Sequence, residues 1–444
     1  MEYIDLTEKL VKKCISLGAD AAEVFLEANR NLSINVLKSE IETIEEASTQ
    51  GVGFRVFVEG RMGFSHCNDL SSKSLEDTIS KAIAFARLST PDENNILTDD
   101  KGMTSIADLY DPAIATVTMD KKINMALELE KLAMKDPRIT KSSGAGYGEG
   151  ESEVFIANSN GILKSFKTSG CSVGVYVVAE KGDQKNTGGE NCSRVFFEDL
   201  VPIEEVAAVA SKKALRLLDP VMIKTQKAPV IFDPDVARSL LGGIISGING
   251  ERVLQGASFL KDYLNKQFAS PFLTMIDDGT RPKSRGSAPF DGEGVPTMKN
   301  TLVENGVLKC FIYNTKAAKR AGVKSTGNAS RGGFSTLPGI GTHNVYVLPG
   351  KQSRNEIIAA TQKGLLLLEV TGYGIDPVSG NFSGGASGLW IENGEIVHPV
   401  KGVTIAGRAF DILNDIDMMG DDLDMNRTNT APTFRVSSMQ IGGK

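Results

Sequence analysis

The stretch VFIANSNGILKSFKTSGCSVGVYVVAEKGD, residues 154–183, decides the fold class of this chain. It is rich in β-branched and aromatic residues, and Asn160-Gly161 divides it into two runs. Because Asn-Gly readily adopts the positive φ angles of a tight hairpin turn, the two runs are predicted to pair as antiparallel strands. Helical spacing occurs on both sides of the pair, over residues 119–136 and 203–219. The sequence therefore predicts an α+β fold, in which helices flank an antiparallel sheet.

A similar order of elements precedes this region. Residues 5–30 have apolar residues at helical spacing, and two alternating runs at 33–47 and 51–67 predict strands. Residues 69–89 then predict an amphipathic helix that has Ser and Asp capping residues at its start. These elements predict an N-terminal α+β domain over residues 1–117.

The rest of the chain is predicted to form a middle region and a C-terminal domain. Residues 118–225 are predicted to form an α+β region packed against the first domain. From residue 226 onward Gly-rich turns are frequent, and the runs 301–313 and 389–400 each turn on Glu-Asn-Gly. The end of the chain, residues 431–444, is again strand-like. Residues 226–444 are therefore predicted to form a mostly antiparallel β domain with a few helices.

Composition excludes several classes of protein. At 444 residues the chain exceeds one ordinary core, so two or three domains are expected. The net charge of −6 and the lack of a basic stripe argue against direct nucleic-acid binding. No run of about 18 apolar residues predicts a membrane span, and the N-terminus does not have the layout of a signal peptide. Five scattered cysteines predict reduced thiols, so we expect a cytoplasmic protein.

The stretch SLLGGIISGINGER, residues 239–252, follows a strand-like run at 228–234, where a phosphate loop or a metal-binding helix would be sought. Its glycines do not precede Lys-Ser/Thr as in a P-loop, and the spacing G-x-G-x-x-G is absent. A buried helix whose glycines allow close packing is the favoured interpretation.

Other candidate sites are weak on spacing alone. The chain has three histidines, which lie far apart: His66, His343 and His398. This separation excludes the H-E-x-x-H and C₂H₂ zinc patterns. Acidic strings at 276–280, 289–297 and 420–426 do not follow the EF-hand order and are typical of turns. The polar, Gly- and Pro-rich run from residue 281 to 300 is unusual, since long ordered loops are often functional.

Several long motifs, in one order, resemble the TldD/PmbA family. The family is linked with peptidase function and has long been labelled a modulator of DNA gyrase. The motifs cover nearly the whole chain and lie at residues 37–65, 255–280, 287–314, 379–402 and 431–443.

The resemblance also indicates which branch of the family this chain is similar to. TldD-type members carry a zinc-binding H-E-x-x-x-H helix and a last ligand Cys near the C-terminus. Alignment through the ING-E and GASF segments puts the His, Glu and His positions at Leu241, Gly242 and Ser246. None of these residues can supply the zinc chemistry, and no Cys follows Cys310. The chain therefore resembles the PmbA/TldE branch, and we expect no catalytic residue, metal or cofactor in this chain itself.

This branch implies a partner. The chain is expected to be a non-catalytic subunit of a TldD/TldE-type metallopeptidase that cleaves unfolded or flexible peptides in the cytosol. The zinc would belong to the TldD-type partner, in a heterodimer or larger assembly, and a homodimer of this chain alone is also open. Five residues are candidates for lining a substrate groove or the subunit interface: Asp278, Gly279, Phe290, Asp291 and Gly292.

Two alternatives remain open at this level. The first is an independent metallopeptidase, whose ligands would be the three histidines and the acidic loops brought together by folding. The second is a regulator of DNA gyrase, which an acidic chain without a basic stripe supports little.

Overall fold

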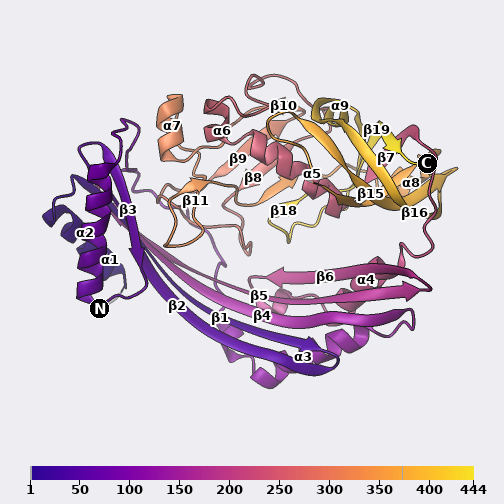
Figure 1. The fold of residues 1–444 in the computed structure, drawn as a ribbon, viewed down its shortest axis with the longest axis horizontal. Coiled ribbons are helices and arrows are strands. Elements are labelled where there is room, and N and C mark those ends of the chain that lie inside the picture. The colour runs from indigo at the N-terminus through magenta and orange to yellow at the C-terminus, as the bar shows by residue number, and fades with distance from the viewer. Residues whose placement is uncertain (1–2, 373) are drawn as a thin grey trace.

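The structure is a computed structural model that describes residues 3–372 and 374–444. The N-terminal half is built on one long, curved antiparallel sheet of six strands in the order β3-β2-β1-β4-β5-β6 (Figure 1). Its strands are β1 (Ala21–Leu37), β2 (Glu40–Val58), β3 (Arg61–Cys67), β4 (Ile139–Asn158), β5 (Leu163–Lys181) and β6 (Gln184–Arg194). The predicted regions 1–117 and 118–225 contribute three strands each, so they share this sheet.

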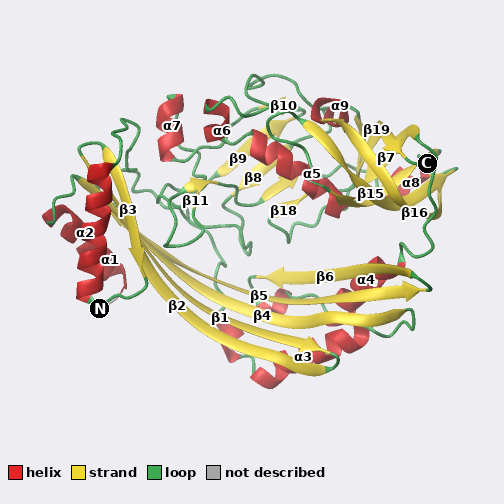
Figure 2. Ribbon diagram, in the orientation of Figure 1, coloured by secondary structure: helices red, strands yellow, loops and turns green. Residues whose placement is uncertain are grey.

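Four helices cover one face of the sheet (Figure 2). They are α1 (Tyr3–Ser16), α2 (Ser72–Leu88), α3 (Met119–Ala133) and α4 (Ile203–Leu215). The helices α1 and α2 pack with Val24 and Leu26 of β1, whereas α3 and α4 pack with Leu32 and Ile34. Because alternate strand residues face the same side, these even-numbered positions place all four helices on the convex face. The opposite, concave face is left for the C-terminal domain. The predicted α+β fold with a flanked antiparallel sheet is confirmed.

The single helix predicted over residues 5–30 is wrong in its second half. The helix α1 ends at Ser16, Gly18 adopts a φ of 104°, and the strand β1 begins at Ala21. The run that follows is rich in Ala, Glu and Leu, which favour a helix in isolation. It is held as a strand because β1 pairs along its length with β2 on one side and β4 on the other.

The C-terminal domain contains a closed ring of five strands, since β16 pairs with β19 as well as with β15. These strands are β7 (Gln226–Phe232), β14 (Lys363–Thr371), β15 (Asn381–Glu392), β16 (Glu395–Arg408) and β19 (Phe434–Gly442), and β17 (Ile416–Met419) is added beside β19. A second sheet consists of β8 (Met275–Asp278), β9 (Lys299–Glu304), β10 (Val307–Leu308), β13 (Val345–Val347) and β18 (Asn429–Thr430). A short pair, β11 (Ala329–Ser330) and β12 (Gly339–Ile340), completes the strands of the described chain. Both predicted Glu-Asn-Gly hairpins form, with positive φ at Asn305 and Asn393.

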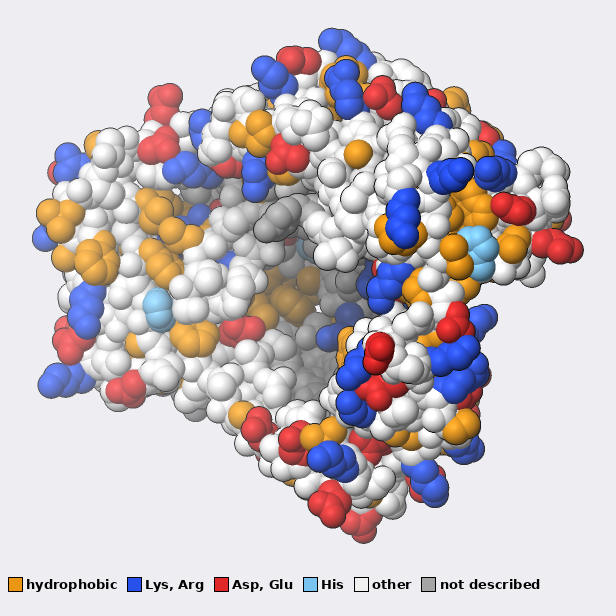
Figure 3. Space-filling model, turned by 45° about the vertical axis from the view of Figure 1, so that its right-hand side comes forward, with side chains coloured by type: hydrophobic (Ala, Val, Ile, Leu, Met, Phe, Trp, Pro, Cys, Tyr) orange, Lys and Arg blue, Asp and Glu red, His pale blue; other side chains and the backbone are white. Residues whose placement is uncertain are grey.

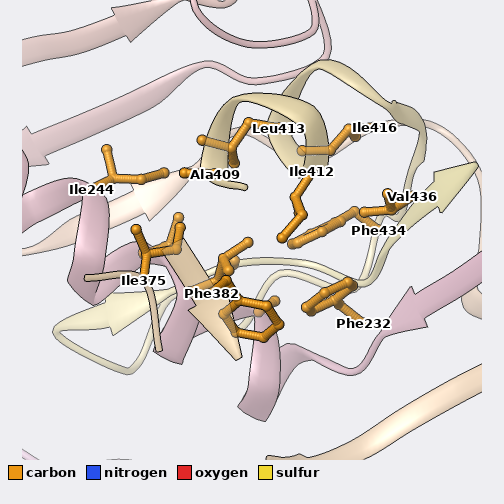
Figure 4. Close-up of a cluster of buried hydrophobic side chains, with 14 of the residues drawn as sticks. Phe232, Ile244, Ile375, Phe382, Ala409, Ile412, Leu413, Ile416, Phe434 and Val436 are labelled. Carbon is orange, nitrogen blue, oxygen red and sulfur yellow. The ribbon is translucent and has the colours of Figure 1, made fainter. Parts of the chain in front are cut away.

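The helices of this domain are α5 (Pro234–Gly247), α6 (Gly250–Leu254), α7 (Thr315–Ala321), α8 (Arg354–Ala359) and α9 (Ala409–Asn414). The predicted close-packed helix is α5, whose Ile244 lies in the main apolar core near Phe382 and Ala409 (Figure 4). A Cβ added at Gly243 would lie 2.4 Å from the Cβ of Ile375, so glycine is required for this packing distance. Across the described residues, no helix is long and apolar enough to cross a bilayer.

Candidate functional site

The concave face of the N-terminal sheet carries small polar residues in matched rows. Paired positions across β1, β4, β5 and β6 form these rows: Asn31–Gly150–Gly170, Ser33–Gly148–Ser172–Ser193 and Asn35–Gly146–Gly174–Asn191. The convex face at the same level is filled by buried apolar side chains under α3 and α4. Such a face buries little apolar surface, so it is suited to contact with water or a polar ligand rather than to core packing.

The C-terminal domain lies over this face (Figure 1), and the space-filling view shows an open hollow between the two halves (Figure 3). A cavity of about 470 Å³ is lined by Asn31, Ser33, Gly148 and Ser172 from the sheet and by Arg285 from the C-terminal domain. This hollow is within the size range of ligand sites in proteins.

A second cavity, of about 420 Å³, lies at the edge of the sheet. Residues 190–194 of β6 form one wall. The remaining lining residues come from α4 and the turn before it and from the C-terminal domain: Val201, Glu205, Val206, Val209, Arg238, Arg285, Asp424, Asn426, Arg427 and Thr428. The strand β6 is the last of the sheet, and among the described residues no backbone hydrogen bond reaches its outer edge. We call this cavity the β6 groove.

The helix α5 turns one face outward, where Arg238 lines the β6 groove, and the other face into the core. Arg238, Gly242 and Ser246 are only partly buried or exposed and lie four residues apart, so they share one face of the helix. A Cβ at Gly242 would meet no described heavy atom within 4 Å. Leu241 is only 2 % exposed and packs in the main core. The three positions that would align with a zinc motif therefore do not converge on one point.

The histidines are equally dispersed. His66 is on β3 beside the ring of Phe334. The Nε2 atom of His343 lies 2.7 Å from the main-chain oxygen of Gly327, and His398 is in β16 opposite Trp390. No group of three or more His, Cys, Asp or Glu residues in the described chain is arranged to hold a metal ion. The alternative ligand set considered from the sequence is thus not brought together.

Comparison with known proteins identifies the group to which this architecture belongs. Three family models match in order: PmbA/TldA metallopeptidase domain 1 at residues 22–86, the central domain at 112–218 and the C-terminal domain at 225–443. The chain is 30% identical to "Metalloprotease PmbA" of Escherichia coli O157:H7 over 100% of this chain and 98% of that protein. The chain belongs to the PmbA/TldD metallopeptidase family.

Solved structures of the PmbA/TldD family have the same fold. The crystal structure of TldE from Thermococcus kodakarensis has a TM-score of 0.89 at 25% identity and covers 98% of this chain and 99% of that one. A putative modulator of DNA gyrase from Thermotoga maritima has a TM-score of 0.90 at 26% identity and covers 99% of this chain and 100% of that one. The archaeal "Metalloprotease MJ0996" of Methanocaldococcus jannaschii is 27% identical over 94% of this chain and 93% of that protein.

The residues of this PmbA/TldD chain do not fit the zinc that the family name implies. On α5, Leu241 is an apolar core residue, Gly242 has no carboxylate, and Ser246 offers one neutral hydroxyl. A zinc site of the family type would need at least two strong ligands from these positions. We therefore derive no reaction step through a metal bound to this chain.

The two candidates at the end of β8 are structural in the isolated chain. The carboxylate of Asp278 accepts hydrogen bonds from the main-chain N and the hydroxyl of Thr280, at 2.9 and 2.7 Å. Gly279 is buried, and a Cβ there would lie 2.8 Å from Thr297 and 3.0 Å from His343. Both residues belong to a buried turn at the end of β8, and their contact with a peptide or a partner remains a prediction.

Of the other three candidates, Phe290 packs the C-terminal domain onto the sheet, whereas Asp291 and Gly292 order a turn within that domain. The ring of Phe290 packs edge-on against Phe166 of β5, with 4.9 Å between centroids. The Asp291 carboxylate accepts main-chain hydrogen bonds from Glu293, Val295 and Ala329 at 2.9, 3.0 and 2.9 Å. Gly292 donates its main-chain N–H to Ala329, and this pairing continues the same turn. A direct role for these residues in a groove or a subunit interface likewise remains a prediction.

A buried ionic network adjoins this turn, and sequence reasoning missed it. Arg55 of β2 lies 2.6 Å from Glu23 of β1 and 2.8 Å from Glu293, and Arg331 contacts the other oxygen of Glu23. Although burial opposes ionisation of Glu293, Arg55 holds its pKa below the usual value. Burial raises the pKa of Asp291 to about 7, and the neighbouring Glu293 carboxylate adds to this rise. A signal was available, because Glu23 and Arg55 interrupt apolar strand runs where charges are rare.

The arginines of the β6 groove were also missed. They come from four distant parts of the chain: Arg194, Arg238, Arg285 and Arg427. No local motif connects them, so only the fold reveals that they share one cavity.

Proposed function

We propose that this chain is a non-catalytic, PmbA/TldE-type subunit of a peptidase assembly that cleaves unfolded or flexible peptides. Its hollow forms part of the chamber that holds the peptide, and a TldD-type partner supplies the zinc and the hydrolytic chemistry. The cytosol is the proposed location, because all five cysteines are free.

The observation that supports this proposal most strongly is that α5 lacks zinc-binding residues at the positions of the family's metal motif. The helix occupies the place that the family resemblance assigns to the metal helix, yet Leu241 is turned into the apolar core. Hydrolysis by a metal centre needs ligands and a base, and α5 provides neither. The concave face supports the second part of the proposal, since the cavity over its small polar rows leaves room for an extended chain.

Co-expression tests the proposal. This chain and a TldD-type chain from the same organism are purified together and separately, and hydrolysis of a casein-like unfolded substrate is measured. We expect no hydrolysis by this chain alone and at least a tenfold gain, on the order of 1.4 kcal/mol in the barrier, when it joins its partner. The matched control is a pair in which the first zinc-binding His of the partner is replaced by Ala, which is expected to be inactive. Equal activity of the partner with and without this chain would remove the proposed role.

A further inference from the structure

The outer edge of β6 offers unpaired backbone groups to a ligand. In antiparallel strands every second residue directs its N–H and C=O away from the neighbouring strand, and β6 has a neighbour only in β5. Residues 190–194 of this edge face the β6 groove, whose other walls belong to α4 and to the C-terminal domain. An exposed edge of this kind is the usual docking place for an extended peptide, which adds to the sheet as a further strand.

The groove also holds cations without carboxylate partners. Arg427 pairs with Glu190 at 2.9 Å and with Asp424 at 3.4 Å, so its charge is already balanced. Among the described residues, neither Arg194 nor Arg285 forms an ion pair with an acid. Arg194 donates only to the main-chain oxygen of Ser193, at 2.9 Å. These two guanidinium groups are available to an anionic ligand.

The position of Arg285 connects the groove to the hollow. A Cβ added at Gly170 would lie 3.4 Å from Nε of Arg285 and 3.5 Å from the main-chain oxygen of Arg194. The Arg285 side chain therefore lies against the sheet at Gly170, next to the end of β6. The same side chain lines both the cavity over the polar face and the β6 groove.

We propose that β6 binds an extended peptide by strand addition and that Arg194 and Arg285 bind a carboxylate of that peptide. This inference deepens the proposed function, on which it rests for the identity of the ligand as a peptidase substrate. Guanidinium–carboxylate hydrogen bonds are charge-assisted and directional, so they set the register of the added strand.

The acidic residues of the groove favour a peptide over a nucleic acid. Glu190, Glu205 and Asp424 also line it, and among described residues Glu205 has no cationic partner. A continuous row of phosphates would be repelled by these carboxylates, and the chain as a whole has a net charge of −6. An otherwise neutral peptide with a single carboxylate suits this groove, because cationic and acidic side chains are mixed along its walls.

Fluorescence anisotropy of labelled, unstructured peptides on the purified full-length chain tests this inference. One probe carries Asp and Glu side chains and an amidated C-terminus, and a second has neutral side chains and a free C-terminal carboxylate. A third, with Lys in place of the acids and an amidated C-terminus, is expected to bind about tenfold more weakly than the better of the first two. The stronger of the first two probes identifies the source of the carboxylate. Equal affinity for all three would overturn the role of the arginines.

Variants of the chain test the arginine–carboxylate contact, and a modified probe tests the backbone pairing with β6. Arg285→Gln and Arg194→Gln are each expected to weaken binding of the preferred probe about tenfold, whereas Arg252→Gln, which removes an exposed cation of α6 outside the groove, leaves it unchanged. N-methylation of alternate probe residues blocks strand addition and is expected to abolish binding. Binding that survives N-methylation, or tighter binding of a single-stranded oligonucleotide than of any peptide, would overturn the proposal.

The result is distinguishable from the test of the proposed function. Peptide binding is measured on this chain without its partner, so a failed co-expression assay leaves the groove assignment standing. Conversely, activation of a partner without peptide binding to the β6 groove would refute this inference alone.

Discussion

At the scale of single residues, the role of a position on α5 depends on the direction of its side chain as much as on the identity of the residue. The alignment with the family's zinc motif placed Leu241, Gly242 and Ser246 at its His, Glu and His positions. It did not distinguish among the three replacements. The structure separates them, because Leu241 belongs to the core whereas the other two lie on the exposed side of α5. Helical periodicity contained this information, since neighbouring residues on a helix point about 100° apart.

Substitutions on α5 are expected to have unequal effects. Leu241→His would place a polar ring in the apolar core and lower the free energy of unfolding by about 2–5 kcal/mol. Gly242→Glu adds a side chain where no described atom lies within 4 Å, and is expected to change stability by less than about 1 kcal/mol. Urea unfolding measures both variants. Similar losses for the two would contradict the orientation assigned to this helix.

The protonation of Asp291 predicts a pH dependence. The folded protein retains this proton up to a pKa of about 7, whereas an unfolded Asp releases it near pH 4. Its stabilising contribution is therefore complete below about pH 4 and is lost as the pH rises to about 7. The loss amounts to at most about 4 kcal/mol.

The variant Asp291→Asn isolates this effect, because the amide does not titrate. Urea unfolding of both proteins across this pH range is expected to show the wild type losing its advantage as the pH rises. Parallel stability curves for the two proteins would show that Asp291 is ionised throughout.

At the scale of elements, local turn chemistry was a reliable guide and helix propensity was not. The Asn-Gly turns correctly predicted the hairpins at residues 301–313 and 389–400. By contrast, the local sequence of the first part of β1 favours a helix. This segment forms a strand because it pairs with β2 and β4, and local sequence patterns do not contain these long-range pairings. For the same reason, the rows of small polar residues on the concave face could be recognised only when the register of four strands was known.

The packing of the edge strand β6 on α4 supports a second stability prediction. A Cβ at Gly188 would lie 2.2 Å from the main-chain N of Ala214, so Gly188→Ala forces β6 and α4 apart. We expect a loss of about 1–3 kcal/mol and weaker peptide binding in the β6 groove. Gly148→Ala is the control, because its added Cβ lies on the concave face no closer than 3.2 Å to Ser172 Oγ. Equal melting temperatures for the two variants would contradict this packing.

At the scale of the whole molecule, a buried ionic network joins the two halves beside the loop at residues 281–300, in addition to more exposed pairs such as Arg427–Glu190. Glu23 and Arg55 come from the N-terminal sheet, and Glu293 and Arg331 come from the C-terminal domain. The loop was recognisable from its Gly and Pro content, but Glu293 and its partner Arg55 are 238 residues apart, so no local pattern could pair them. This junction fixes the C-terminal domain to the end of the sheet that carries Glu23 and Arg55.

Breaking the network is expected to loosen the molecule as a whole. Arg55→Met leaves the carboxylates of Glu23 and Glu293 buried without their shared partner, at a cost of about 3–5 kcal/mol. Arg30→Met removes an exposed pair with Glu46 on the same sheet and is expected to have little effect. Limited proteolysis between the halves and thermal unfolding measure the difference. A melting temperature for Arg55→Met within error of Arg30→Met would show that the network does not hold the halves together.

The central claim is that this member of the PmbA/TldD family does not itself carry the catalytic metal. Elemental analysis of the purified chain after dialysis against zinc, followed by metal-free buffer, tests this most directly. We expect far less than one zinc per chain, with stoichiometric zinc appearing only in a complex with a TldD-type partner. One tightly held zinc per isolated chain, lost together with peptidase activity on chelation, would contradict it.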